Sequence, residues 1–142
     1  MDNKKNTLEM KELLEKLNNL SEKRINFYEK WNDDKWFYEW SKTYFEQIPE
    51  ELQESLQENK LNNSVYLEDE LWDVMWCYLC LLNSLKAEWK ITSVEKVFER
   101  SYKKFTGRLN EKTWENNWEW NDVKKKQKEE RKKENDLIYK KK

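Results

Sequence analysis

The chain has 142 residues, of which 40% are charged and 15% are aromatic, and its formal net charge is −1. It contains nine tryptophans but only one glycine, one proline and no histidine. This length suits one domain with a single core, and the shortage of glycine and proline argues against tight loops around a phosphate or substrate. We therefore expect an all-α interaction domain.

The charge is unevenly distributed along the chain. Residues 124–142 contain ten basic and four acidic side chains, a net charge of +6, so the remaining residues carry −7. This asymmetry predicts an acidic helical bundle over residues 1–123 and a basic extension, helical or frayed, over residues 124–142. The simpler alternative is that the extension is only the solvated end of a helix.

Apolar residues at helical spacing, such as Leu13 and Leu17, predict a first helix. Ser21 is a suitable N-cap for a second helix with Glu22 in its first turn, which we expect to run on through Ile25 to Ile48. Because proline disfavours the helical conformation of the residue before it, Pro49 is expected to end that helix and to open a short new one.

The best loop in the chain is residues 59–64. After it, residues 71–85 are apolar nearly all round, which is typical of the most buried helix of a bundle. We expect Trp72 and Trp76 to belong to the core, because they lie one turn apart on this helix.

A capping box at residues 92–95 predicts the start of another helix. Gly107, the only glycine, is placed where that helix could end in the left-handed conformation. The last helix is expected to bury Trp114 and Trp118 and then to become polar.

Cys77 and Cys80 do not predict a metal site. Zinc needs four ligands, and the sequence offers no histidine and no other cysteine. We interpret them as two small buried residues one turn apart, and we predict no metal and no cofactor.

The sequence also predicts no catalytic residues. Its carboxylates fall on helical positions expected to be exposed, and no nucleophile lies beside a candidate base. These positions include Glu50, Glu51, Glu54 and Glu58. Residues 46–73 hold nine acidic side chains and Lys60 as the only base. We interpret this stretch as a solvated surface or, alternatively, a docking face for a basic partner.

Tryptophans with charged neighbours are candidate contacts for a partner protein, and the basic extension could support them. The partner-binding residues predicted in this way are Trp36, Trp40, Trp89, Trp120, Lys124, Lys125, Lys126 and Lys128. Nucleic-acid binding is not expected, because the basic residues are concentrated in the extension and not interleaved with the aromatic ones.

The order of these features resembles the PHIST (Plasmodium helical interspersed subtelomeric) domain, also called the RESA N-terminal domain, over nearly the whole chain. The residues that carry the resemblance are 12–20, Phe27, Trp31, Asn32, 48–51, Trp72, Glu95, Phe98, Phe105, Trp114 and Trp118.

The resemblance implies a non-enzymatic bundle of three long helices, exported to the host red-cell cytoplasm or the cytoplasmic face of its membrane. Its implied partners are the acidic segment of a surface adhesin or the cytoskeleton. The alternative is a lipid-binding module at an anionic membrane surface, similar to the tryptophan-rich parasite antigens. Without the resemblance, we expect a cytosolic protein or a fragment of a longer one.

Overall fold

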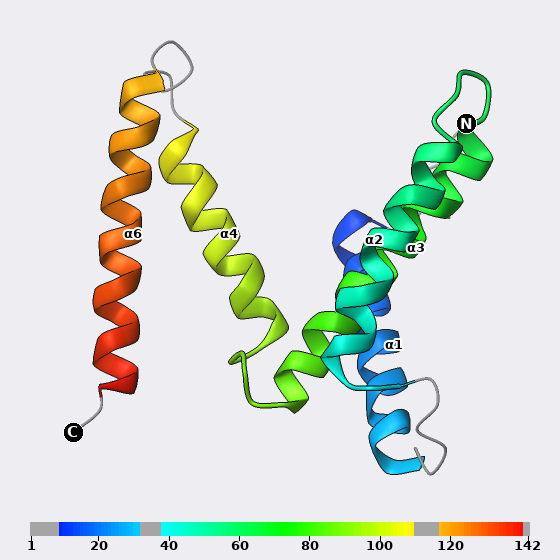
Figure 1. The fold of residues 1–142 in the computed structure, drawn as a ribbon, viewed down its shortest axis with the longest axis horizontal. Helices are drawn as coiled ribbons and strands as arrows, with labels where there is room; N and C mark the ends of the chain where they lie inside the picture. The colour runs from blue at the N-terminus through cyan, green and yellow to red at the C-terminus, as the bar shows by residue number, and fades with distance from the viewer. Residues whose placement is uncertain (1–8, 32–37, 110–116, 141–142) are drawn as a thin grey trace. The chain divides into compact units, whose positions relative to one another are not determined.

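The computed structural model describes residues 9–31, 38–109 and 117–140. Within these residues it contains five α-helices and no strand, so the expected all-α fold is confirmed (Figure 1). The helices are α1 (Met10–Trp31), α2 (Ser41–Gln57), α3 (Ser64–Ala87), α4 (Val94–Arg108) and α6 (Asn117–Tyr139). None of the described helices is long and apolar enough to cross a membrane.

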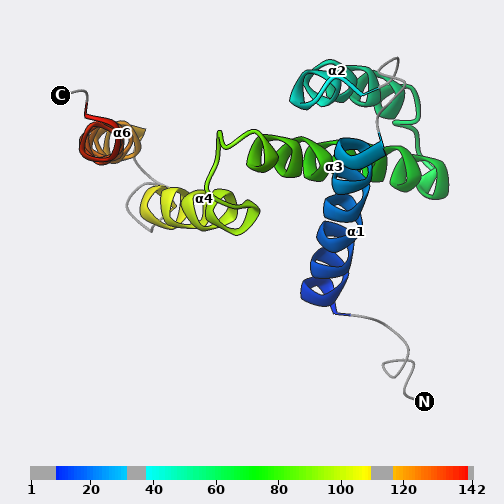
Figure 2. The same cartoon turned by 90° about the horizontal axis from the view of Figure 1, so that it is seen from below.

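The chain divides into two compact units, Met1–Val94 and Glu95–Lys142. In the first unit α2 lies alongside α3, while α1 crosses α3 (Figures 1 and 2). The units also differ in charge. Residues 1–94 hold 12 basic and 19 acidic side chains, a net of −7, whereas residues 95–142 hold 16 and 10, a net of +6. The predicted body and extension, residues 1–123 and 124–142, stay a prediction.

The core of the first unit is built around α3 and is rich in tyrosine. Its buried members are Ile25, Tyr38, Tyr44, Cys77, Cys80 and Leu81. The Tyr38 ring stacks on Tyr28 with the centroids 4.9 Å apart, and its hydroxyl lies 3.2 Å from Ser84 Oγ. A stacked aromatic pair stabilises a fold by about 0.5–1.5 kcal/mol beyond the effect of its buried area. Through Tyr28 on α1 and Ser84 on α3, Tyr38 joins both helices to the segment before α2.

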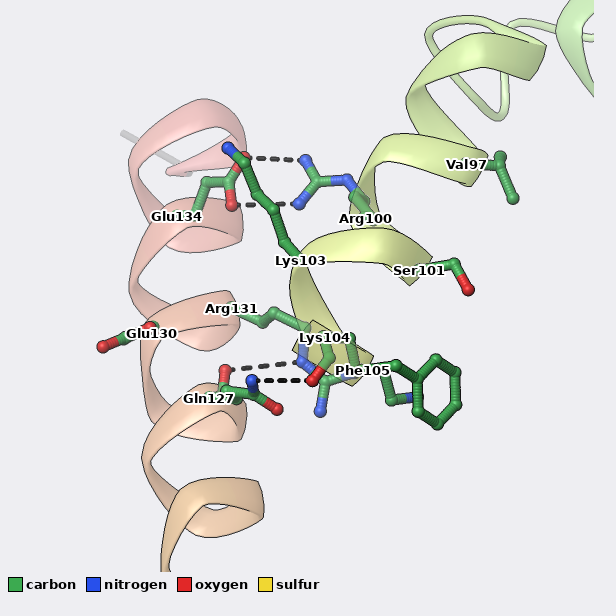
Figure 3. Close-up of a pocket in the computed structure, with 10 residues that line it drawn as sticks. All are labelled: Val97, Arg100, Ser101, Lys103, Lys104, Phe105, Gln127, Glu130, Arg131 and Glu134. Carbon is green, nitrogen blue, oxygen red and sulfur yellow. Dashed lines mark hydrogen bonds and ion pairs between the residues drawn. The ribbon is translucent and has the colours of Figure 1, made fainter. Parts of the chain in front are cut away.

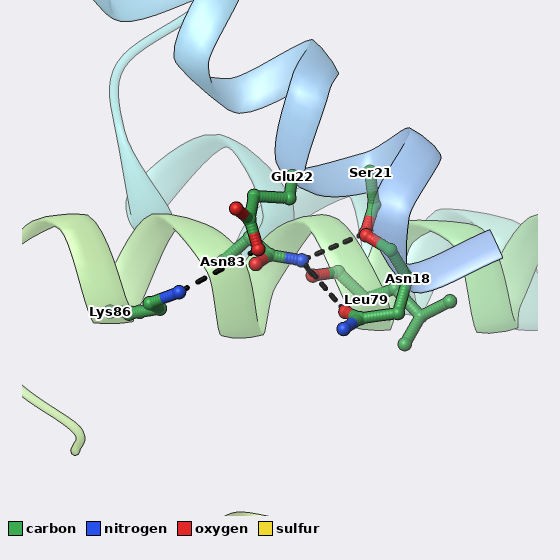
Figure 4. A network of polar contacts seen from close by, with 6 residues as sticks. All are labelled: Asn18, Ser21, Glu22, Leu79, Asn83 and Lys86. Atoms are coloured by element: carbon green, nitrogen blue, oxygen red, sulfur yellow. Dashed lines mark hydrogen bonds and ion pairs between the residues drawn. The ribbon is translucent and has the colours of Figure 1, made fainter. Parts of the chain in front are cut away.

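A buried amide fixes where α1 crosses α3 (Figure 4). Asn83 is 3% exposed, and its Nδ2 donates to Ser21 Oγ at 2.8 Å and to Asn18 Oδ1 at 3.1 Å. The Ser21 hydroxyl donates in turn to the Asn18 carbonyl at 2.8 Å. Ser21 is therefore an interior residue of a continuous α1, and the prediction that it caps a new helix is wrong. The Ser21 hydroxyl forms hydrogen bonds with Asn18 within α1 and with Asn83 of α3, and not with the free N–H groups at the start of a helix.

The expected end of the helix at Pro49 is also wrong, because α2 runs through Pro49. An interior proline removes one helical hydrogen bond and costs about 3 kcal/mol. We attribute the survival of the helix to its packing along α3. The consequence is that Gln47 and Glu51, on either side of the proline, are held by the same helix.

The first half of α3 is less buried than its composition predicts. Trp72 is 39% exposed, so its assignment to the core is wrong, whereas Trp76 is partly buried and packs against the core. On α1, Leu13 and Leu20 are 41% and 53% exposed. The fully buried part of α3 begins at Cys77, so the core lies toward the C-terminal half of this helix.

Trp89 ends α3 in a conformation that usually requires glycine. Its φ is 61°, its N–H donates to the Lys86 carbonyl at 3.0 Å, and the Lys90 N–H donates to the Leu85 carbonyl at 2.9 Å. This is the Schellman arrangement, in which the left-handed position normally holds glycine. The side chain gains little in return, since it is 93% exposed.

In the second unit, Gly107 on α4 leaves room for the Gln127 side chain of α6. Its φ is not positive and α4 continues to Arg108, so the predicted left-handed helix end is wrong. A Cβ on Gly107 would lie 2.6 Å from Gln127 Nε2. That amide is held in place, because its Nε2 donates to the Lys104 carbonyl at 3.1 Å and its Oε1 accepts from Arg108 Nε at 2.9 Å.

A second link joins these helices nearer the start of α4. Arg100 donates two hydrogen bonds to the Glu134 carboxylate, at 2.7 and 3.0 Å. The helix predicted after residues 92–95 begins at Val94. The predicted burial of Trp114 and Trp118 falls outside the side chains that the structure describes.

Candidate metal centre

Two pairs of acidic side chains meet where α2 and α3 run antiparallel. The direction follows from the contacts, since Ser41 at the start of α2 donates to Glu88 beyond the end of α3, at 2.7 Å from its N–H. Residues three apart lie on the same face of a helix. Glu51 and Glu54 therefore share a face of α2, and Glu70 shares a face of α3 with Asp73, three residues further on.

Three of these carboxylates lie unusually close together. One oxygen each from Glu51, Glu70 and Asp73 lie within 4.8 Å of one another. The Oε2 atoms of Glu51 and Glu70 are buried and have no hydrogen-bond partner among the described residues. None of the three carboxylates forms an ion pair with a lysine or arginine among the residues that the structure describes. We call these three residues the acidic cluster.

The electrostatics of the acidic cluster disfavour its charged form. Burial raises the pKa of Glu51, and repulsion by Glu54 and then Asp73 raises it further. The pKa of Glu70 is raised by loss of hydration and then by Glu54. Loss of hydration and repulsion by Asp69 and Glu54 likewise raise the pKa of Asp73. Like charges held this close need a proton or a cation between them.

A divalent cation fits this set of donors. Mg²⁺ prefers carboxylate oxygens and is commonly held by one or two protein carboxylates together with substrate phosphates. The two buried oxygens without hydrogen-bond partners are the ones for which a cation would remove the cost of burial. Because the ligands must be deprotonated, binding of such an ion would strengthen as the pH rises.

The thiols lie beside this centre without joining it. Cys77 is one turn beyond Asp73, and its Sγ lies 3.7 Å from Gln47 Oε1. Both cysteines are free and buried, as predicted. Burial raises the pKa of Cys77 to about 11 and that of Cys80 to about 12, so neither thiol is ionised near neutral pH.

Sequence reasoning missed the acidic cluster, because it treated the acids of residues 46–73 as solvated surface or a docking face. One signal was available. Acids three residues apart recur on two consecutive helices joined by a short loop, at Glu51 and Glu54 and again at Glu70 and Asp73. Antiparallel pairing of the helices brings these two pairs together.

The predicted partner-binding residues lie elsewhere. Trp40, which is 48% exposed, and Trp89 both lie at the end of the first unit where α2 begins and α3 ends. Trp120 is partly buried on α6, with Arg108 Cζ 5.7 Å from its ring centroid. Trp36 lies outside the described residues. The lysines Lys124, Lys125, Lys126 and Lys128 are exposed on α6. A binding role for these residues stays a prediction.

Comparison with known proteins adds one finding. A family model described as the MazG nucleotide pyrophosphohydrolase domain matches residues 40–112, just over half of the chain. The match includes α2, α3 and α4, and it contains every residue of the acidic cluster. No curated protein and no solved structure matches the chain.

This match corrects several predictions. The resemblance to the PHIST domain is wrong, because the matching family is a different helical one. The family is one of enzymes, so the predictions of a non-enzymatic adaptor, an adhesin or cytoskeletal partner and a membrane-surface module are overturned with it. The error arose because helical periodicity and tryptophan pairs one turn apart occur in many helical bundles. The location of the protein stays a prediction.

Proposed function

The chain belongs to the MazG nucleotide pyrophosphohydrolase domain family, and we propose that it hydrolyses a nucleoside triphosphate to the monophosphate and pyrophosphate. The observation that carries this proposal is the acidic cluster within the matched residues, with two buried carboxylate oxygens that have no partner among the described residues. An enzyme that handles pyrophosphate needs a means of binding polyanionic phosphates, and a cation held by carboxylates supplies it.

Glu51, Glu70 and Asp73 are the residues that would hold the cation. When bound, a divalent ion would draw charge from the phosphate oxygens and stabilise the pyrophosphate that leaves. The protein contributes the position of the ligands. Two of them are fixed on α3 and one on α2, so the α2–α3 packing sets the geometry of the site.

Glu54 completes the proposed site. It lies one turn from Glu51 on the same face of α2, and it is not among the three closest oxygens. Its charge acts on all three members of the acidic cluster, since it raises the pKa of each. We assign to Glu54 the acceptance of the proton from the attacking water, because a carboxylate not used as a ligand can act as a general base.

The experiment is a hydrolysis assay on the full chain with each common nucleoside triphosphate, with Mg²⁺ or Mn²⁺ and with a chelator. Products are separated by ion-exchange chromatography. The expected products are the monophosphate and pyrophosphate in equal amounts, and the chelator is expected to abolish both. The diphosphate with inorganic phosphate would indicate a different bond cleavage, and no turnover of any nucleotide with either metal would contradict the proposal.

A further inference from the structure

The second unit contains a basic groove formed by α4 and α6, separate from the acidic cluster in sequence and in unit (Figure 3). Its volume is about 430 Å³. The groove is held in shape by the two links between its helices, Arg100 with Glu134 and Gln127 with Lys104 and Arg108. It is therefore a built feature of the second unit.

The charges that line this groove are unequally neutralised. Arg100 and Glu134 neutralise each other through their two hydrogen bonds. Lys103, Lys104 and Arg131 form no ion pair within the part of the chain that the structure describes. The remaining acid of the lining, Glu130, extends from the side of α6 away from α4 (Figure 3). The groove thus has three cations without an ion pair among the described residues and one acid at its edge. Lys103 nevertheless lies near enough to Glu134 to add to the lowering of its pKa by Arg100, and Arg131 Nε donates to the Gln127 carbonyl at 3.4 Å.

An aromatic side chain lies among these cations. Phe105 lines the groove and is 42% exposed, and Lys104 Nζ lies 5.5 Å from its ring centroid. Along the sequence, Phe105 is distant from the basic extension. Phe105 directly follows Lys103 and Lys104, and the side-chain links between α4 and α6 bring Arg131 to the same groove.

We propose that this groove binds single-stranded nucleic acid, with the cations of both walls contacting phosphates and Phe105 stacking on a base. A positively charged groove that follows the backbone, combined with an aromatic platform, is the general means by which single strands are bound without sequence preference. This proposal concerns binding alone and does not depend on the hydrolytic function proposed above.

The distribution of charge favours a strand over a free nucleotide. Exposed basic residues continue on the Arg131 face of α6 at Lys128 and Lys124, so that the basic stripe from Lys124 to Arg131 rises about 10 Å. A mononucleotide carries its phosphates as one compact group and could contact only part of this surface. A strand presents regularly spaced phosphates, and the second unit carries a net charge of +6 with which to attract them.

The experiment measures the fluorescence anisotropy of a labelled ten-nucleotide oligouridine on addition of the 142-residue chain, over a range of salt concentrations. The groove variant is Lys103→Gln/Arg131→Gln, neither of whose side chains forms the links between α4 and α6. Loss of two phosphate contacts is expected to weaken binding roughly tenfold at low salt and to reduce the slope of log K against log salt by about 1.4.

The matched control is Lys125→Gln/Lys140→Gln, which removes the same charge from the second unit at residues that do not line the groove. We expect its affinity to stay within about twofold of the wild-type value. A second variant, Phe105→Leu, keeps every charge. It is expected to weaken binding roughly fivefold without changing the salt slope, because one stacking contact is lost.

Three results would overturn the proposal. One is an equal loss in the groove and control variants, which would indicate diffuse attraction. Another is displacement of the oligouridine by inorganic triphosphate at the same phosphate concentration, which would indicate a site for small phosphates. The last is no binding of oligouridine by the wild-type protein at low salt. Circular dichroism melts of each variant establish that it is folded before binding is compared.

Discussion

Two carboxylate sites, one in each unit, have opposite environments. In the second unit, Glu134 accepts two hydrogen bonds from Arg100, and this guanidinium lowers the pKa of the carboxyl. In the first unit, Glu51 and Glu70 each bury an oxygen that has no partner among the described residues, and the pKa of both is raised. Glutamate thus stabilises the contact between α4 and α6, whereas it has an electrostatic cost where α2 meets α3.

The difference separates a structural acid from a functional one. A paired carboxylate contributes to the fold that contains it, although an exposed pair contributes little. Crowded, unpaired carboxylates on two packed helices cost stability, and such a cost is expected where the groups serve binding or catalysis. A functional carboxylate in this chain is therefore recognised by burial among other acids without a cationic partner, and not by the number of acidic residues around it in the sequence.

The strongest test of this comparison removes one charge from the acidic cluster. Glu70→Gln is expected to lower the rate of nucleotide hydrolysis by more than about 100-fold, since loss of groups that merely support metal ligands already costs 10–100-fold. The rate of pyrophosphate release measures it. Glu68→Gln, the same change at an exposed position two residues earlier on α3, should leave the rate unchanged. A similarly large loss of rate in the Glu68→Gln control would show that the acidic cluster is no more important for hydrolysis than an exposed acid.

A smaller effect is expected from Gly107→Ala in the second unit. Alanine improves helix propensity by about 1 kcal/mol, but its Cβ would displace the Gln127 amide, whose two hydrogen bonds are each worth about 1 kcal/mol. We expect a net loss of about 1 kcal/mol in the free energy of unfolding, measured by urea denaturation. In a Gln127→Ala background the clash is absent, and the same change should become stabilising. A loss of equal size in both backgrounds would show that Gln127 is not responsible.

The smallest effect compares one substitution in the two environments, in metal-free protein near neutral pH. Glu51→Gln should raise Tm by about 1–2 °C, a small change because the side chain is partly hydrated. Glu134→Gln should lower Tm slightly, because it removes the charge that Arg100 binds. Thermal melts followed by circular dichroism measure both. Shifts of the same sign would contradict the contrast between the two carboxylates.

The pH dependence follows from the direction of each pKa shift. The pKa of Glu51 is raised above 4.5, so the stability linked to it is present below that value and is lost as the pH rises through the folded pKa. The pKa of Glu134 is lowered, so its contribution is present above 4.5 and is lost as the pH falls through the folded value. Added Mg²⁺ should therefore raise Tm more near pH 7 than near pH 5.

The sequence was sufficient for the fold class and for the loop before α3, because helical periodicity and an Asn-rich break are local signals. It was insufficient at Ser21 and Pro49, where packing against α3 overrides a local preference for a helix boundary. At Gly107 the local rule suggested a left-handed helix end, whereas the residue is needed for the approach of Gln127 from α6.

The candidate site shows the same limit more clearly. Glu51 and Asp73 are far apart along the chain, and only the antiparallel pairing of α2 with α3 makes them neighbours. Periodicity alone places such acids on solvated faces. The groove has a similar origin, because Phe105 and Arg131 line one groove only when side-chain links join α4 to α6.

The buried thiols give this molecule an internal reporter of breathing motions. Cys77 contacts Gln47 across the α2–α3 interface, one turn from Asp73. A thiol reagent can reach Cys77 only when α2 and α3 separate locally. The rate of Cys77 modification therefore measures how often the helices that carry the acidic cluster open. Saturation with a divalent ion that bridges both helices should therefore lower the rate of Cys77 alkylation, although the thiol itself is chemically unchanged.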